Sequence, residues 1–271
     1  FSAVDGQKVE SYPVVREKVA EAEGIFGVKS GVRNDTNLLG LKAGGYWKKN
    51  QDAGVGNHQS STVLFCKMSG VPLAFVSANY LTALRTAAAA GLATRALARE
   101  DAQTLAIIGA GGQAPFQIEA IRAVRPIERV LIVSRSQTSA EELAAGLNGV
   151  GAVKAIACDA EAACKDADIL TTVTPSSEQL VQAGWIRPGT HINAMGADTR
   201  GKRELDPKLL LSSRVFVDDW RQASTIGECQ HLAHSGELSL EGIAGTLGGL
   251  ASGRDVGRLA ATDVTVFDST G

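Results

Sequence analysis

A glycine-rich turn, Gly109-Ala110-Gly111-Gly112-Gln113-Ala114, is the segment of this sequence whose residue types and spacing point most directly to chemistry. It follows the apolar run 104–108 and opens a helical pattern, and it fits G-x-G-x-x-[GA] with Ala114 in the last place. The first two glycines permit a tight turn and a close approach to a pyrophosphate, which the helix N-terminus then favours. We expect all six residues to bind a dinucleotide; the alternative is a structural loop that binds no cofactor.

The second strand ends at Ser134-Arg135-Ser136, where a site that prefers NAD usually presents Asp or Glu to the ribose 2′-hydroxyl. A guanidinium between two hydroxyls suits a 2′-phosphate instead, because arginine donates parallel N–H bonds to it. These residues predict a preference for NADP(H), with NAD(H) as the alternative and a solvated Arg135 as the plainer interpretation. Thr174, just after the apolar run 169–173, completes the expected cofactor contacts.

The elements that position these residues alternate between short apolar strands and helices from residue 103 onward. Strands are expected at 104–108, 130–133, 153–158, 169–173, 191–194 and 215–217, with helices around 118–124, 139–147 and 159–165. Strands that are apolar throughout and alternate with helices indicate a parallel sheet covered on both faces. The fold class is therefore α/β, with a Rossmann-type doubly wound parallel sheet.

The first hundred residues lack this rhythm and predict a second, α+β domain. The runs 62–66 and 73–76 flank Ser69-Gly70 and indicate a hairpin, and the Ala-rich run 81–97 indicates a long helix capped near Thr82. We expect residues 1–100 to form the first part of this domain and residues 101–230 to form the dinucleotide-binding domain. Residues 231–271, with the strand-like run 264–267, are expected to return to the first domain.

Composition excludes several classes of function. The chain has 271 residues, 44% hydrophobic and 21% charged, and a net charge of −2 gives no general attraction to nucleic acid or anionic membranes. We see no run of 18 apolar residues and no secretory signal, although a sequence that begins at Phe1 leaves room for a start further upstream. The four scattered cysteines suit a reducing cytoplasm, and the four histidines lack a metal-binding context, so we expect no metal.

Three segments together resemble the ornithine cyclodeaminase/μ-crystallin family: LGLKAGGYW at 39–47, YLTALRTAA at 80–88, and INAMGADTRGKREL at 192–205. The turn GAGGQA and the late Val217-Asp218-Asp219 match in the same order. The resemblance extends over essentially the whole chain, which begins and stops inside the family's usual ends. It implies a homodimer joined through the non-Rossmann domain and hydride chemistry at the α-carbon of a small amino or imino acid.

The resemblance also implies roles for three residues. Arg85, a guanidinium among small residues of the Ala-rich helix, would bind the substrate carboxylate, with an internal salt bridge as the alternative. Lys42, in the Gly-rich segment, would contact the carboxylate and assist proton transfer, unless it is simply exposed. Asp198 would face the substrate nitrogen as acid or base, unless it caps the following segment; μ-crystallin-like relatives lack an acid here.

Lys29 is a further candidate substrate-binding residue. Cyclodeaminases of the family favour an acidic residue in this region to hold the distal amine of ornithine, and we see no clear acid here. If Lys29 or His58 points inward, the second group of the substrate is anionic or absent rather than cationic. Arg16 and Arg33 are further basic residues of this domain, and each alone is better explained as a surface residue.

The leading hypothesis is an NAD(P)H-dependent reductase of small 2-imino acids, either cyclic ketimines such as pyrroline-2-carboxylate or acyclic imines such as iminosuccinate. The second hypothesis is an ornithine cyclodeaminase, in which NAD takes a hydride and returns it while ammonia leaves. The third is a non-catalytic, μ-crystallin-like protein that binds NADP(H), against which the presence of Lys42, Arg85 and Asp198 together argues.

Overall fold

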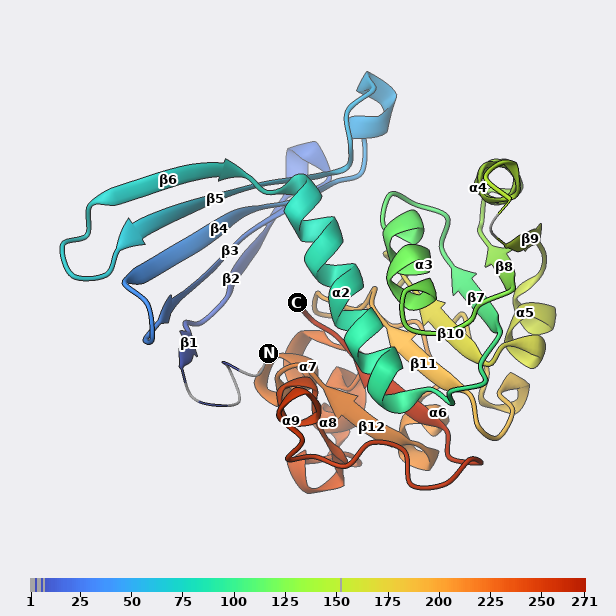
Figure 1. Cartoon of the computed structure of the whole chain (residues 1–271). Coiled ribbons are helices and arrows are strands. Elements are labelled where there is room, and N and C mark those ends of the chain that lie inside the picture. Colours follow the sequence, from blue (N-terminus) through green and yellow to red (C-terminus); the bar gives the residue numbers. More distant parts are fainter. Residues whose placement is uncertain (1–2, 4–5, 7, 152) are drawn as a thin grey trace. The chain divides into compact units, whose positions relative to one another are not determined.

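The computed structural model describes Ala3, Gly6 and residues 8–151 and 153–271, and it divides into two compact units, Phe1–Arg85 and Thr86–Gly271 (Figure 1). The first unit is built on an antiparallel sheet and the second on a parallel one. The division falls within the long helix α2 (Asn79–Leu97), so that its first two turns belong to the first unit.

The sheet of the first unit has six strands in the order β1-β3-β4-β5-β6, with β2 paired to β3. The strands are β1 (Val9–Ser11), β2 (Val15–Val19), β3 (Gly24–Arg33), β4 (Leu38–Trp47), β5 (His58–Cys66) and β6 (Pro72–Ser77). The β3–β4 pairing runs without interruption from Gly24 opposite Trp47 to Arg33 opposite Leu38. The expected hairpin is confirmed as β5 and β6, and Gly70 in its turn has a φ of +71°.

The parallel sheet of the second unit has eight strands in the order β13-β12-β14-β11-β10-β7-β8-β9, which confirms the Rossmann-type fold. Its strands are β7 (Thr104–Ile108), β8 (Arg129–Val133), β9 (Lys154–Ala157), β10 (Ile169–Thr172), β11 (His191–Ala194), β12 (Arg214–Val217), β13 (Gly245–Thr246) and β14 (Thr265–Asp268). The strand order reverses at β7, which lies between β8 and β10. Doubly wound sheets bind their ligands at the carboxyl ends of the strands beside such a reversal.

Helices pack on the parallel sheet and complete the core. Besides α2 they are α3 (Ala114–Arg122), α4 (Gln137–Gly149), α5 (Ala160–Asp166), α6 (Pro207–Ser212), α7 (Trp220–Ile226), α8 (Gln230–Ser235) and α9 (Leu247–Ser252), with short 3-10 helices at Ala20–Ala22, Asn50–Ala53, Ala183–Trp185 and Leu240–Gly242. In the second unit, Ala89, Ala93 and Leu97 of α2 share one face of the helix and lie in a buried cluster with Phe216 and Phe267. Alanine at these positions lets the helix backbone approach the sheet closely.

One expectation about the C-terminal segment is wrong. The run 264–267 does not return to the antiparallel sheet; residues 265–268 form β14, which pairs in parallel with β11 on one side and β12 on the other. All four residues of β14 are buried. A strand covered on both faces needs apolar side chains on each face, and the adjacent Val266 and Phe267, which project to opposite faces, supply them. The parallel sheet therefore includes strands from beyond residue 230.

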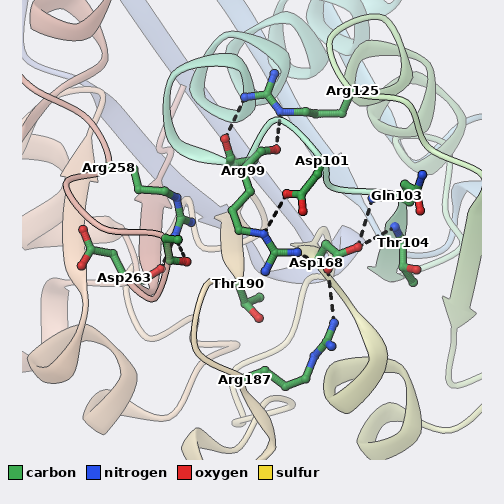
Figure 2. Close-up of polar contacts among 12 residues, drawn as sticks. Arg99, Asp101, Gln103, Thr104, Arg125, Asp168, Arg187, Thr190, Arg258 and Asp263 are labelled. Atoms are coloured by element: carbon green, nitrogen blue, oxygen red, sulfur yellow. Dashed lines mark hydrogen bonds and ion pairs between the residues drawn. The ribbon is translucent and has the colours of Figure 1, made fainter.

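Charged side chains secure the amino-terminal edge of the parallel sheet (Figure 2). Asp168, just before β10, accepts hydrogen bonds from the backbone N–H groups of Gln103 and Thr104 and from the guanidinium of Arg99 at 2.8 Å. Arg125 donates to the carbonyl of Arg95 in the last turn of α2 and to those of Ala98 and Arg99 just after it. This edge lies opposite the carboxyl ends of the strands, so we assign it to stability rather than to substrate chemistry.

Candidate active site

The glycine-rich turn after β7 lies against the end of β10. Gly109 has a φ of +115°, and a Cβ added to it would lie 2.8 Å from the carbonyl oxygen of Val173 and 3.1 Å from Cγ2 of Thr174. Any other residue would therefore be strained in its backbone and would clash with the neighbouring strand end. The structure thus brings two expected cofactor contacts, Gly109 and Thr174, together at the reversal of the strand order.

The rest of this turn leaves room for a phosphate group. A Cβ added to Gly111 or Gly112 would meet no atom within 4 Å. Helix α3 begins at Ala114, so its N-terminal amides follow this open backbone directly. The Gln113 Oε1 atom is buried without a hydrogen-bond partner among the described residues, and it is an acceptor available to a ligand or water. These features fit a bound dinucleotide.

The residues after β8 have structural contacts of their own. Ser136 is the N-cap of α4, and its Oγ accepts hydrogen bonds from the N–H of Ser139 at 3.2 Å and from the hydroxyl of Ser139 at 3.0 Å. The Oγ of Ser134 accepts from the N–H of Ser136 at 3.2 Å. Arg135 between them is exposed. The serines therefore shape the loop, and the guanidinium is left to contact solvent or a ligand.

A buried carboxylate, Glu204, joins the ends of β10 and β11. One of its oxygens accepts from the backbone N–H and the hydroxyl of Thr174, both at 2.7 Å. The other accepts from the hydroxyl of Thr172 at 2.8 Å and the N–H of Gly196 at 3.0 Å. Complete burial raises the pKa of Glu204, while these hydrogen bonds oppose the rise. Glu204 thus holds the cofactor-side loop and the loop that carries Asp198 in one arrangement.

Asp198 lies on the loop after β11, at the same sheet edge as the glycine-rich turn. Its Oδ1 accepts from the ammonium of Lys202 at 2.7 Å and from the hydroxyl of Thr199 at 3.1 Å. Lys202 also donates to the carbonyl of Gly196 at 3.3 Å. The side chains of Asp198 and Lys202 are 34% and 21% exposed, so this pair is still reachable by a small molecule. Lys202 balances the charge of Asp198 and fixes its orientation.

In the first unit, Lys42 points toward the start of α2. Its Nζ donates to the Thr82 hydroxyl at 3.2 Å, and the Thr82 hydroxyl also lies 3.3 Å from the Ser60 hydroxyl. Helix α2 begins at Asn79, three residues before Thr82, so Thr82 does not cap the helix as we expected; it links α2 to β4 and β5. Arg85 follows Thr82 by three residues, a spacing that places both on one face of the helix.

Sequence reasoning missed Glu204 and Lys202 as residues that hold the loops of the candidate site. Both belong to the GADTRGKREL stretch that carries Asp198, and Lys202 stands four residues after it. A lysine four residues after an aspartate indicates an ion pair when both lie on a helix. Here the pair forms although Lys202 lies in a loop. Nothing local marks Glu204, because glutamate in a polar stretch ordinarily indicates an exposed side chain.

Two further features concern metals and membranes. Within the part of the chain that the structure describes, no three His, Cys, Asp or Glu side chains are grouped so as to hold a metal ion. His191 is completely buried between Thr265 and Asn193, and burial lowers its pKa to about 3.

Among the described helices, none combines the length and apolarity that crossing a membrane requires.

Comparison with known proteins identifies relatives along the whole chain. The model of the ornithine cyclodeaminase/mu-crystallin family matches residues 2–271. The chain is 40% identical to the iminosuccinate reductase of Paracoccus denitrificans, over 100% of this chain and 84% of the relative. The structure of that enzyme with NAD+ superimposes with a TM-score of 0.88, covering 100% of this chain and 83% of the other.

Two other solved structures are similarly close in fold. The Thermococcus litoralis Δ1-pyrroline-2-carboxylate reductase, in complex with NADH and L-proline, has a TM-score of 0.94 at 29% identity and covers 100% of this chain and 84% of its own. An archaeal alanine dehydrogenase dimer with bound NAD has a TM-score of 0.92 at 33% identity, with coverage of 100% and 82%. The chain described here belongs to the ornithine cyclodeaminase/mu-crystallin family.

Proposed function

We propose that this protein is an NAD(P)H-dependent oxidoreductase that reduces small 2-imino acids to amino acids by hydride transfer to the α-carbon. One observation carries the proposal: Glu204 accepts hydrogen bonds from both Thr174 and Gly196. Thr174 follows β10 beside the glycine-rich turn, and Gly196 begins the loop that carries Asp198, so Glu204 connects the two loops. A group able to exchange a proton with a substrate nitrogen thus belongs to the same sheet edge as the cofactor turn. The three relatives compared above are named for reactions of amino or imino acids, which supports this assignment.

The protein's residues would bind and orient the substrate. The ammonium of Lys42 and the guanidinium of Arg85 would hold the α-carboxylate, since Thr82 directs Lys42 to the face of α2 that carries Arg85. A bound reduced nicotinamide would supply the hydride. Asp198, held by Lys202, would face the substrate nitrogen and supply the proton that reduction of the imine consumes, or accept that proton in the reverse direction. Gly109, Gly111 and the start of α3 would hold the pyrophosphate of the cofactor.

We propose NADP(H) as the preferred cofactor, with NAD(H) also accepted. The exposed Arg135 after β8 supports this preference, because that strand end is where a Rossmann-type domain contacts the ribose 2′ position. The solved relatives contain NAD+ or NADH, which supports use of the non-phosphorylated cofactor by the family. Initial rates with both reduced cofactors decide the preference, and a higher kcat/KM with NADH would reverse it.

We propose a homodimer in the cytoplasm. The archaeal alanine dehydrogenase is described as a dimer. The first unit also exposes a run of large apolar residues on the edge strand β6, where Leu73 is 55% and Phe75 74% exposed. A stretch of this kind suits an interface between protomers.

The cysteines bear on the compartment. They are few and scattered, which suits a reducing compartment such as the cytoplasm.

Two assays separate reduction from its alternatives. Imino acids formed in place from 2-oxo acids with ammonia, together with pyrroline-2-carboxylate, should cause net loss of absorbance at 340 nm in the presence of NADPH. A cyclodeaminase would instead release ammonia from ornithine without net change in the cofactor, and a non-catalytic binding protein would do neither.

The substitution Arg85→Ala tests the carboxylate anchor. It should lower kcat/KM by an amount equivalent to a loss of about 2–5 kcal/mol in transition-state binding free energy. A loss below about tenfold, or about 1.4 kcal/mol, would mean that Arg85 does not anchor the carboxylate.

A further inference from the structure

Two lysines face each other across the centre of the antiparallel sheet. In the β3–β4 pairing, Lys29 lies directly opposite Lys42. Residues directly opposite in an antiparallel pair project to the same side of the sheet with Cβ atoms about 5 Å apart, and like charges in this position destabilise the pair. Both side chains are half-buried. The arrangement therefore favours an anion that both ammonium groups can approach.

Glycines frame both lysines. On β3 the neighbours that share the side of Lys29 are Gly27 and Gly31, and on β4 those that share the side of Lys42 are Gly40 and Gly44. A glycine adds no side chain to this side of the sheet, so along both strands the lysine pair stands next to bare backbone. A Cβ added to Gly27, Gly31 or Gly44 would lie 2.8, 2.5 or 2.2 Å from a backbone oxygen of the neighbouring strand, so these glycines let the strands approach closely and add no side chain beside the lysine pair.

Further basic side chains belong to the same side. Arg16 on β2 lies opposite Gly27, and His58 on β5 lies opposite Tyr46, which alternates with Lys42 on β4. We call Arg16, Lys29, Lys42 and His58 the basic face. All four side chains are half-buried.

The acidic residues of the neighbouring strands project to the other side. Glu10 on β1 lies opposite Val32, and Glu17 on β2 lies opposite Phe26. These β3 positions alternate with that of Lys29, so their side chains project away from the basic face. The charge that the strands contribute to the basic face is therefore positive.

The first turns of α2 lie over the basic face. Thr82 accepts a hydrogen bond from Lys42 and contacts the Ser60 hydroxyl, and Ser60 alternates with His58 on β5. Arg85 shares the helix face of Thr82. Lys42 is therefore opposite Lys29 on the sheet and, through Thr82, contacts the helix whose same face carries Arg85.

We propose that the basic face binds a second carboxylate through Lys29, and that the substrate of this protein is a 2-imino dicarboxylic acid. The inference rests on the proposed function and names its substrate class. Lys42 and Arg85 hold the carboxylate next to the reacting carbon, and Lys29, with Arg16 diagonal to it, holds the distal carboxylate. A diamino acid, whose distal group is an ammonium, is repelled by the same residues.

The test compares two imines that differ in the distal carboxylate. The full chain is assayed at 340 nm with NADPH and ammonia, once with oxaloacetate and once with 2-oxobutyrate, and each oxo acid without ammonia serves as a blank. We expect kcat/KM for the dicarboxylic imine to exceed that for the monocarboxylic imine by about 100-fold, as a charged hydrogen bond allows. Lys29→Gln should lower the first value by about 10- to 100-fold and change the second by less than about threefold.

Matched variants complete the test. Lys48→Gln removes one exposed lysine of the same unit and should leave both values unchanged. Lys29→Arg retains the positive charge and should keep the preference for the dicarboxylate. Equal rates for the two imines in the wild type, or equal losses in Lys29→Gln, would overturn the second carboxylate site while leaving the reductase assignment intact. If the wild type oxidises NADPH with neither imine nor with pyrroline-2-carboxylate, the proposed function itself fails.

Discussion

Replacing Glu204 by glutamine would show whether this buried carboxylate positions the active-site loops. The side chain is completely buried, and its two oxygens accept four hydrogen bonds. The backbone N–H of Thr174 points at one oxygen and the backbone N–H of Gly196 at the other. A glutamine amide has a single acceptor oxygen, so in either orientation its NH2 group faces one of these backbone donors.

The expected magnitude follows from this count of donors. The two threonine hydroxyls can rotate and accept from an amide, whereas a backbone N–H cannot. One buried N–H is therefore left without an acceptor, which costs about 1–3 kcal/mol, and we expect the free energy of unfolding to fall by that amount. A displacement on the order of 1 Å near the reacting atoms reduces rates by roughly 100-fold, so we expect kcat/KM to fall by roughly 10- to 100-fold.

The assay combines urea unfolding of the purified variant with initial rates at 340 nm. Glu161→Gln is the matched control, because Glu161 is 51% exposed and pairs only at the surface with Lys165. That change should alter stability by less than about 0.5 kcal/mol and leave kcat/KM unaffected. If Glu204→Gln behaves like the control in both measurements, the carboxylate does not position the loops and the reasoning is wrong.

Three further changes test other parts of the site. Gly111→Ala adds a Cβ that meets no protein atom within 4 Å, so it should preserve stability but raise the dissociation constant for NADPH in a fluorescence titration. Gly109→Ala, at a φ of +115°, should instead lower the free energy of unfolding by about 1–3 kcal/mol. Identical behaviour of the two variants would contradict the assignment of Gly109 to the turn and Gly111 to cofactor binding. Burial raises the pKa of Glu228 to about 8 from its ordinary 4.5, so the folded state retains a proton that the unfolded state loses, and this contribution to stability decreases as pH rises between those values. Glu228→Gln should therefore flatten the pH dependence of the urea midpoint between about pH 5 and pH 8, and an unchanged slope would exclude the shift. Arg135→Ala should lower kcat/KM with NADPH by about tenfold and leave the value with NADH within about twofold, whereas an equal loss with both cofactors would exclude contact with a 2′-phosphate.

The fold could be predicted largely from local patterns, because buried parallel strands are apolar throughout. The runs that became β7 and β8 stand out for this reason, whereas β10 and β11 also contain buried polar residues. The partner of a strand is not encoded in the strand itself, however. The run 264–267 looks like any short strand, and only the pairing of β14 with both β11 and β12, together with its complete burial, shows that it is internal to the parallel sheet.

The site divides in the same way between local and non-local information. The turn at Gly109 was identifiable because its spacing and its place after a strand are local features. The contact of Gly109 with Thr174, and the bonds of Glu204 to residues more than twenty positions away, depend on how strands assemble. Lys29 was noticed as a basic residue, but its position opposite Lys42 follows from a strand register that the sequence does not display.

Transfer of an isotope from cofactor to substrate tests the central claim most directly. The full chain would be incubated with NADPH deuterated at both C4 positions and an imino acid that supports turnover, and the amino acid product would be analysed by mass spectrometry. We expect one deuterium on the α-carbon of each product molecule, with an equal amount of cofactor oxidised. Product without deuterium at the α-carbon, or ammonia released from ornithine while the cofactor remains unoxidised, would contradict the proposed reduction.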